Sequence, residues 1–199
     1  MSFALTTEIA AAAARLVVEE GLEYGPAKRR AARSLGKHST RSADLPDNTM
    51  VEAEVRAYID LFCADTQPAE LAALREVAVG WMQRLAEFRP HLTGAVWRGT
   101  ATRLNNVHIE LYCDDSKSAE IGLLDRGIDF DIGSVDGPRN RPVDVLRTCS
   151  TSQALGEEVS VFLTVLDHDD LRGGLKPDAS GQIPRGDLNA LRQRMEKHE

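Results

Sequence analysis

The sequence predicts an α+β or α/β fold, in which a helical region over residues 1–90 precedes a mixed β-sheet flanked by helices over residues 91–199. Two periodicities predict this. Apolar residues recur every three or four positions in the first part, which is the period of an amphipathic helix. In the second part they alternate with polar residues, which is the period of a half-buried strand. With 199 residues, 42% of them hydrophobic, the chain is long enough to bury a sizeable core.

The N-terminal region is expected to hold four helices, over residues 6–20, 26–35, 50–63 and 68–88. The polar segment 37–49 contains a proline and is predicted to be a loop. The fourth helix carries the longest apolar stripe, which ends at Pro90. This stripe favours packing onto the sheet or the neighbouring helices, although a dimer seam has the same spacing.

The central stretch runs from Gly94 to Asp115, and two neighbouring strands are expected in it, over residues 95–97 and 106–114. In the second strand an apolar face alternates with a polar face that carries Asn106, His108 and Glu110. Further strands are expected at 128–132, 143–149 and 158–166, and a last helix at 187–197. The strand at 158–166 is almost wholly apolar, which is typical of the middle of a sheet covered on both faces.

The net charge of −7 is unevenly distributed. Residues 1–41 hold seven Lys or Arg and four Glu, a balance of +3, so the remainder carries −10. The predicted second helix bears four basic residues, Lys28, Arg29, Arg30 and Arg33. They indicate a solvated helix face or a nucleic-acid-binding helix. Because the acidic body repels phosphate backbones, nucleic acid is the less favoured partner.

Targeting signals and cysteine motifs are absent from the sequence. No run approaches the ~20 apolar residues of a membrane span, and the first residues lack the basic and apolar regions of a signal peptide. We therefore expect a cytoplasmic protein with no membrane partner. The three cysteines, Cys63, Cys113 and Cys149, form no C-x-x-C pair and are expected to be small buried residues.

A glycine-containing turn followed by an alternating strand is the feature that suggests a family. Gly99-Thr100, then Arg103, then the strand 106–111 resembles the nucleotidyltransferase signature of the polymerase-beta superfamily. In that family a Gly-Ser pair precedes a strand with two acidic residues separated by one hydrophobic residue. The resemblance implies a mixed sheet flanked by helices, with Mg²⁺ held by carboxylates for nucleotide transfer. It also implies that Gly99, Thr100, Arg103 and Asn106 meet the nucleotide.

The chain departs from the family at the two acidic positions of this signature. They fall on Asn106 and His108, or in a shifted register on His108 and Glu110, so at most one is a carboxylate. A metal site for Mg²⁺ or Mn²⁺ would therefore combine Glu110 with Asp129 or Asp131, which alternate on the next predicted strand. The same two aspartates are also typical of the solvent face of an edge strand.

Two further groups of polar residues allow more than one interpretation. His108 and Glu110 are expected either to form a general acid/base pair or to make an ordinary polar cross-strand contact. The run Asp167-His168-Asp169-Asp170 contains ligands suited to Zn²⁺ or Mn²⁺. Asp169 and Asp170 also suit capping of the following turn, which we favour.

Three functional hypotheses follow. A G-x-S-x-G elbow and a P-loop are both absent, so a serine hydrolase and a P-loop kinase or ligase are disfavoured. The preferred hypothesis is a nucleotidyltransferase-like domain that has lost catalysis and binds a nucleotide or a protein partner. The first alternative is an active, divergent metal-dependent nucleotidyl or phosphoryl transferase. The second is a nucleic-acid-associated scaffold that uses the basic helix.

Overall fold

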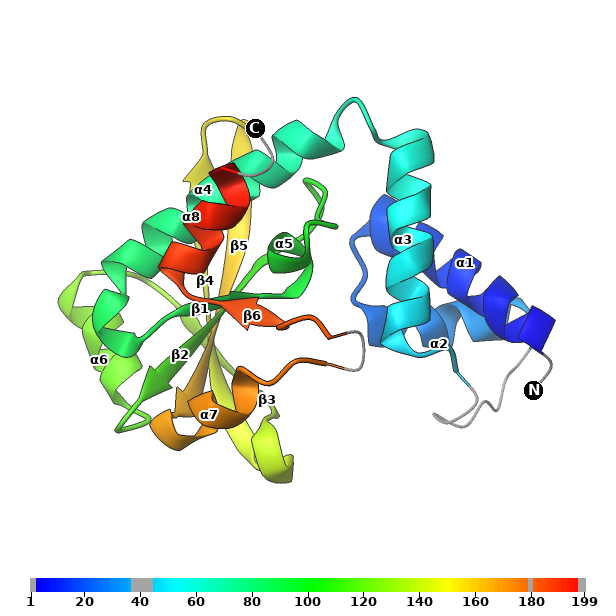
Figure 1. The fold of residues 1–199 in the computed structure, drawn as a ribbon. Helices are drawn as coiled ribbons and strands as arrows, with labels where there is room; N and C mark the ends of the chain where they lie inside the picture. Colours follow the sequence, from blue (N-terminus) through cyan, green and yellow to red (C-terminus); the bar gives the residue numbers. More distant parts are fainter. Residues whose placement is uncertain (1–2, 37–44, 179–180, 197–199) are drawn as a thin grey trace. The chain divides into compact units, whose positions relative to one another are not determined.

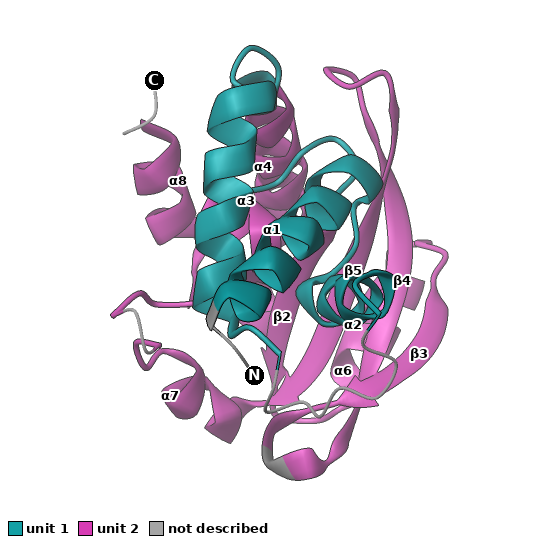
Figure 2. Ribbon diagram, turned by 90° about the vertical axis from the view of Figure 1, so that its right-hand side faces the viewer, with its two compact units in different colours: residues 1–69, 100–105 teal, residues 70–99, 106–199 magenta. Residues whose placement is uncertain are grey.

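The computed structural model describes residues 3–36, 45–178 and 181–196 and has an α+β fold with a six-stranded mixed sheet (Figure 1). The predicted fold class is therefore confirmed. The chain divides into two compact units (Figure 2). Unit 1 comprises residues 1–69 and 100–105, and unit 2 comprises residues 70–99 and 106–199. Most of the fourth helix, which the sequence grouped with the helical region, thus belongs to unit 2.

Unit 1 is built from three helices, α1 (Phe3–Glu20), α2 (Tyr24–Ser34) and α3 (Asn48–Phe62). Their buried faces consist largely of small residues such as Ala13 and Ala31, which allow the helices to approach closely. The side chain of Asp47 accepts a hydrogen bond of 2.7 Å from the backbone N–H of Met50 and so caps the start of α3. Most of the predicted loop 37–49 lies outside the described residues.

The segment 100–105 is held against the helices of unit 1 by close backbone contacts. Gly21 has φ +68°, and a Cβ at this position would lie 2.6 Å from the carbonyl oxygen of Leu104. Only glycine fits both this conformation and this approach. The side-chain amide of Gln67 donates a hydrogen bond of 2.9 Å to the carbonyl of Ala101.

The sheet of unit 2 has the strand order β3-β4-β5-β2-β1-β6. The strands are β1 (His91–Thr93), β2 (Val107–Cys113), β3 (Asp131–Asp136), β4 (Pro142–Ser152), β5 (Glu157–Asp167) and β6 (Arg185–Gly186). β2 and β5 run parallel, and every other neighbouring pair is antiparallel. β5 therefore lies in the interior of the sheet, as its apolar sequence predicted.

One face of this sheet is buried throughout its centre. The side chains on this face are fully buried in the two central strands, at Val107, Ile109 and Leu111 of β2 and at Val161 and Leu163 of β5. The helices of unit 2 are α4 (Gln67–Arg84), α5 (Gly94–Arg98), α6 (Ser118–Asp125), α7 (Leu171–Gly174) and α8 (Leu188–Glu196). Short 3-10 turns occur at Ala86–Phe88, Pro138–Asn140 and His168–Asp170. The apolar stripe of α4, Leu71, Leu74, Ala78 and Trp81, is buried, which supports packing within the protein.

Two of the predicted strands differ from the observed ones. Residues 95–97 belong to α5, because Gly94 has φ +74° and turns the chain directly after β1. Val96 and Trp97 are consecutive and both buried. In a strand they would point to opposite faces, whereas in a helix neighbouring residues can pack on the same side. The strand expected at 128–132 begins at Asp131, so Asp129 precedes it.

The three cysteines are all free and differ in burial. Cys113 is buried and Cys63 is half-buried, whereas Cys149 is exposed, so the prediction of three buried residues is wrong for Cys149. Residue 149 alternates with the buried Thr148 along β4, so its side chain projects from the opposite side of the strand, where it is exposed.

The helices of the described segments were also compared with the requirements of a membrane span. None of them combines the length and the apolar character that crossing a bilayer requires.

Candidate functional site

The second face of the sheet carries the polar residues that the sequence singled out. Strand pairing places Arg185, Thr93, His108, Phe162, Arg147 and Asp131 in one row that crosses all six strands. We call this set the cross-strand row. Because paired residues of neighbouring strands project to the same side, the whole row faces one way. Its central members are half-buried or exposed.

Ring contacts order the middle of the cross-strand row. The imidazole of His108 stacks on the ring of Phe162 with a centroid separation of 5.1 Å and an interplanar angle of 12°. On the other side, the guanidinium carbon of Arg147 lies 6.0 Å from the Phe162 centroid. The row thus presents an aromatic pair next to a positive charge, a combination that suits bases and phosphates.

Glu110 occupies the same face two residues beyond His108, where it belongs to a separate group of charged residues. Its carboxylate accepts a hydrogen bond of 2.7 Å from the hydroxyl of Tyr112 and forms an ion pair with Arg185 of β6. Arg185 Nη1 also donates to the Tyr112 hydroxyl at 2.8 Å. We call Glu110, Tyr112 and Arg185 the Glu110 cluster. The side chains of Glu110 and Arg185 are only 14% and 19% exposed, so this ion pair is weakly screened by water.

The surroundings of the Glu110 cluster keep the Tyr112 hydroxyl protonated and bring the backbone of Gly174 close to it. Burial raises the pKa of the Tyr112 hydroxyl well above its ordinary value, and the Glu110 carboxylate adds to this rise. The phenol therefore remains a donor at neutral pH. A Cβ at Gly174 would lie 2.8 Å from Arg185 Nη1 and 2.9 Å from the Tyr112 hydroxyl, so glycine lets the backbone approach the cluster closely.

The acid/base pair expected of His108 and Glu110 is not assembled in the structure. Both residues project from the same face of β2, but the hydrogen bonds of Glu110 go to Tyr112 and Arg185. His108 instead stacks on Phe162. Residues i and i+2 of a strand are about 7 Å apart, and the two side chains have different partners: His108 contacts Phe162 of the neighbouring strand β5, and Glu110 contacts Tyr112 of β2 and Arg185 of β6.

The metal site expected of Glu110, Asp129 and Asp131 is likewise not assembled. Strands β4 and β5 lie between β2 and β3. Three strand spacings place Glu110 and Asp131 about 14 Å apart, far beyond what one ion bound at about 2–2.6 Å can bridge. Asp129 precedes β3, and both aspartates are exposed. Among the described residues, no group of three or more His, Cys, Asp or Glu is arranged to hold a metal ion.

The predicted nucleotide-binding residues are distributed over both units. Gly99 ends helix α5 with φ +85° rather than following a strand, so the expected strand before it is wrong. Asn106 directly precedes β2 in unit 2 and is half-buried. Thr100 and Arg103 belong to unit 1, in which Thr100 is buried and Arg103 is exposed. The glycine that follows a strand and lies against β2 is Gly94, whose Cβ position is 3.6 Å from the His108 ring.

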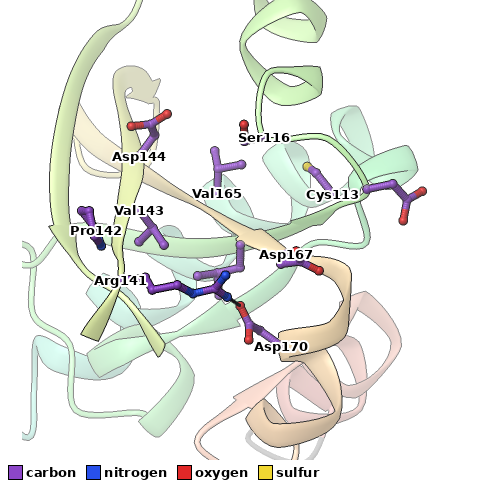
Figure 3. A pocket seen from close by; sticks show the side chains of 11 residues that line it. Cys113, Ser116, Arg141, Pro142, Val143, Asp144, Val165, Asp167 and Asp170 are labelled. Atoms are coloured by element: carbon purple, nitrogen blue, oxygen red, sulfur yellow. Dashed lines mark ion pairs between the residues drawn. The ribbon is translucent and has the colours of Figure 1, made fainter. Parts of the chain in front are cut away.

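A pocket of about 270 Å³ lies at the carboxyl ends of the parallel strands β2 and β5 (Figure 3). Four aspartates line it, Asp114, Asp144, Asp167 and Asp170. Asp170 is 8% exposed and forms an ion pair of 3.8 Å with Arg141, which reaches it from the start of β4. Apolar surroundings raise the pKa of the Cys113 thiol to about 11. Carboxyl ends of parallel strands are a common ligand position, and this one favours positively charged groups.

The run 167–170 caps the turn that follows β5, but through a different residue from the predicted ones. The cap is Asp167, whose carboxylate accepts a hydrogen bond of 2.9 Å from the backbone N–H of Asp169. Asp169 and Asp170 were the expected caps. The side chain of Asp170 makes no capping hydrogen bond and contributes to the pocket instead.

The basic helix α2 is partly neutralised within unit 1. Lys28 donates to the carbonyl of Pro46 and to the side chain of Asn48, and burial lowers its pKa. Arg30 forms an ion pair with Glu20. Two of the four basic residues therefore have structural roles, and Arg29 and Arg33 are exposed.

The chain was compared with known protein families, curated proteins and solved structures. No family model, no curated protein and no solved structure matches the chain. Its chemistry must therefore be inferred from its own residues.

Arg185 is the residue of this site that the sequence did not indicate. It lies 75 positions from Glu110, between the last predicted strand and the last predicted helix, and its neighbours form no recognised motif. It reaches Glu110 because the two-residue strand β6 pairs with β1. With this arginine in place, the polar face offers a neutralised carboxylate beside an aromatic and cationic row.

Proposed function

We propose that unit 2 is a nucleotidyltransferase-like domain that binds a nucleotide without metal-dependent catalysis. The observation that carries the proposal is the ion pair between Glu110 and Arg185. In the family that the sequence resembles, carboxylates on this strand hold Mg²⁺. Here the charge of the single carboxylate on β2 is balanced by the Arg185 guanidinium, and the Tyr112 phenol donates a hydrogen bond to it, so a metal ion would have to displace both.

The turn after β1 supports the resemblance on which this proposal depends. β1 pairs with β2, and Gly94 follows it directly and lies against His108. A glycine turn after one strand, beside the polar face of the next, is the arrangement that the signature implies. The sequence resemblance is based on Gly99, which ends α5, and within this proposal Gly94 takes the place of that glycine.

The cross-strand row supports a nucleotide as the ligand. His108 and Phe162 supply aromatic rings, and Arg147 supplies a charge that is exposed to solvent. Aromatic groups stack with bases, and guanidinium groups bind phosphate through paired hydrogen bonds. These groups need no metal to contact a nucleotide.

A thermal-shift titration of the full chain with ATP, GTP, CTP and UTP, each with and without Mg²⁺ or Mn²⁺, tests the proposal. A ligand that binds only the folded state raises its apparent stability. We expect at least one nucleotide to give a shift of the same size with and without metal. Arg147→Gln should weaken binding about tenfold, because a charged hydrogen bond to phosphate is lost. Arg192→Gln on α8, also exposed, is the matched control and should change nothing.

The other outcomes separate the remaining hypotheses. A shift that requires metal would refute the proposal and favour the active, divergent transferase. The absence of any shift would refute nucleotide binding and favour the protein-partner form of the hypothesis. Retention on nucleic acid at low salt, lost as salt rises, would favour the scaffold that uses α2.

A further inference from the structure

A second pocket lies beyond the β1–β6 edge of the sheet, and Arg185 is the one member of the cross-strand row that lines it. It has a volume of about 650 Å³ and lies entirely within unit 2. Its walls include His91, Trp97, Ile183, Arg185, Ala190 and Arg194. We call it the edge pocket. Its volume is in the range of pockets that bind small organic molecules.

His91 supplies one polar atom to this pocket. The residue is only 8% exposed, and its Nδ1 lies 2.9 Å from the carbonyl oxygen of Arg89. A carbonyl accepts hydrogen bonds only, so Nδ1 must carry a proton. Nε2 has no hydrogen-bond partner within the described part of the chain. A ring nitrogen without a protein partner, on a residue that lines the pocket, is an atom with which a ligand can form a hydrogen bond.

Arg185 supplies a guanidinium to the pocket, and only one of its three nitrogens forms hydrogen bonds within the protein. Both of its hydrogen bonds, to Glu110 and to Tyr112, leave from Nη1. Neither Nε nor Nη2 has a hydrogen-bond partner among the residues that the structure describes. Nε is buried from solvent, so Nη2 is the donor that can bind an anion while Nη1 continues to hold Glu110.

The rest of the wall is mixed and held by several hydrogen bonds. Leu175, Ile183 and Ala190 are apolar and Gln182 and Gln193 are polar. Asp187 is acidic, and its carboxylate accepts a hydrogen bond of 2.8 Å from the backbone N–H of Ala190 at the start of α8. The indole of Trp97 donates a hydrogen bond of 2.8 Å to the carbonyl of Ile183, and the hydroxyl of Thr93 donates one of 3.1 Å to the carbonyl of Pro184. The guanidinium of Arg194 stacks over the Trp97 ring at 3.9 Å. These contacts fix the segment that encloses the pocket, and Arg194 adds positive charge to the wall.

From these contacts we propose that the edge pocket binds a small organic anion, namely a carboxylate or phosphate monoester with an apolar body. The anionic group accepts hydrogen bonds from Arg185 Nη2. His91 Nε2 contacts the same group or a neighbouring hydroxyl, and the apolar body packs against Trp97 and Ile183. This site shares Arg185 with the cross-strand row but does not use His108, Phe162 or Arg147, so Arg147→Gln should weaken nucleotide binding and leave binding in the edge pocket unchanged.

Isothermal titration of the full chain with benzoate, phenyl phosphate, inorganic phosphate and benzyl alcohol tests the inference. We expect benzoate or phenyl phosphate to bind at least tenfold more tightly than benzyl alcohol, which has the ring but no charge. Tighter binding of phenyl phosphate than of benzoate assigns a phosphate ester, and the reverse assigns a carboxylate. Inorganic phosphate should bind more weakly than phenyl phosphate, because it lacks the apolar body. Equal binding of charged and neutral probes, or no binding of either organic anion, would overturn the inference.

A pair of variants on α8 locates the binding. Ala190 is half-buried and lines the pocket, whereas its neighbour Asn189 is exposed and does not. Ala190→Phe should fill the pocket and abolish binding, and Asn189→Phe should leave it unchanged. Thermal unfolding of both variants confirms that they are folded. Undiminished binding to a folded Ala190→Phe protein would show that the anion binds elsewhere and would refute the assignment.

Discussion

Replacing Arg185 with methionine tests the role of the ion pair in holding the sheet edge. Arg185 lies on β6, and its charge meets Glu110 on β2, two strands away. Methionine keeps most of the apolar stem but removes the charge, so the Glu110 carboxylate stays largely buried with only the Tyr112 hydroxyl as a partner. The variant therefore measures the cost of leaving this carboxylate without its cation.

The magnitude follows from the burial of the two side chains. Removing one partner of a fully buried pair costs about 3–5 kcal/mol, whereas exposed pairs contribute about 0–1 kcal/mol. With 14% and 19% of the two side chains exposed, this pair lies nearer the buried limit. We expect the free energy of unfolding to fall by about 2–3 kcal/mol. Glu110→Gln in the same chain should recover part of this loss, because no buried charge then remains.

Urea unfolding followed by tryptophan fluorescence is the appropriate assay. Both tryptophans of the chain, Trp81 and Trp97, belong to unit 2, so the signal reports this unit alone. Arg192→Met, at an exposed position of α8, is the control and should change the stability by less than about 0.5 kcal/mol. If Arg185→Met behaves like this control, or if its effect and that of Glu110→Gln simply add, the two side chains are not coupled and the argument fails.

Two further predictions concern backbone packing and thiol reactivity. A Cβ at Gly186 would lie 2.0 Å from the ring of Trp97, so Gly186→Ala should destabilise unit 2 by about 1–3 kcal/mol in urea unfolding. Gly80→Ala, on helix α4 with open space around it, should instead be neutral or stabilising by up to about 1 kcal/mol, and equal effects of the two changes would contradict this reasoning. Since the pKa of Cys113 is raised to about 11, its thiol should react slowly with iodoacetamide at pH 8 and faster as the pH rises toward that value. The exposed Cys149 should be modified first, and mass mapping of a time course that found Cys113 modified first would contradict the prediction.

Periodicity predicted the long elements of this protein well. β2 and β5 extend over seven and eleven residues, and the alternating apolar residues Val107, Ile109, Leu111, Val161 and Leu163 face the buried side of the sheet. A strand of this length shows a clear alternation of apolar and polar residues, because one of its faces is buried and the other is nearer to water. The same alternation placed His108 and Glu110 together on the polar face before any tertiary contact was known.

The short elements show no such alternation in the sequence. β1 and β6 have three and two residues, too few to show a period, and α5 was read as a strand because Ala95-Val96-Trp97 is simply apolar. Each of these segments takes its conformation from its partners. β1 and β6 exist as strands only because they extend the ladder beyond β2.

The sequence by itself determined the fold class, the interior position of β5 and the polar face of β2, because these depend on local periodicity and burial. Tertiary structure alone decided what the polar residues meet. Strand order places β4 and β5 between Glu110 and Asp131 and so separates the expected metal ligands. The pairing of β6 brings Arg185 to Glu110 across 75 residues of sequence. Strand order and long-range pairing depend on contacts between distant segments, and no local pattern in the chain encodes them.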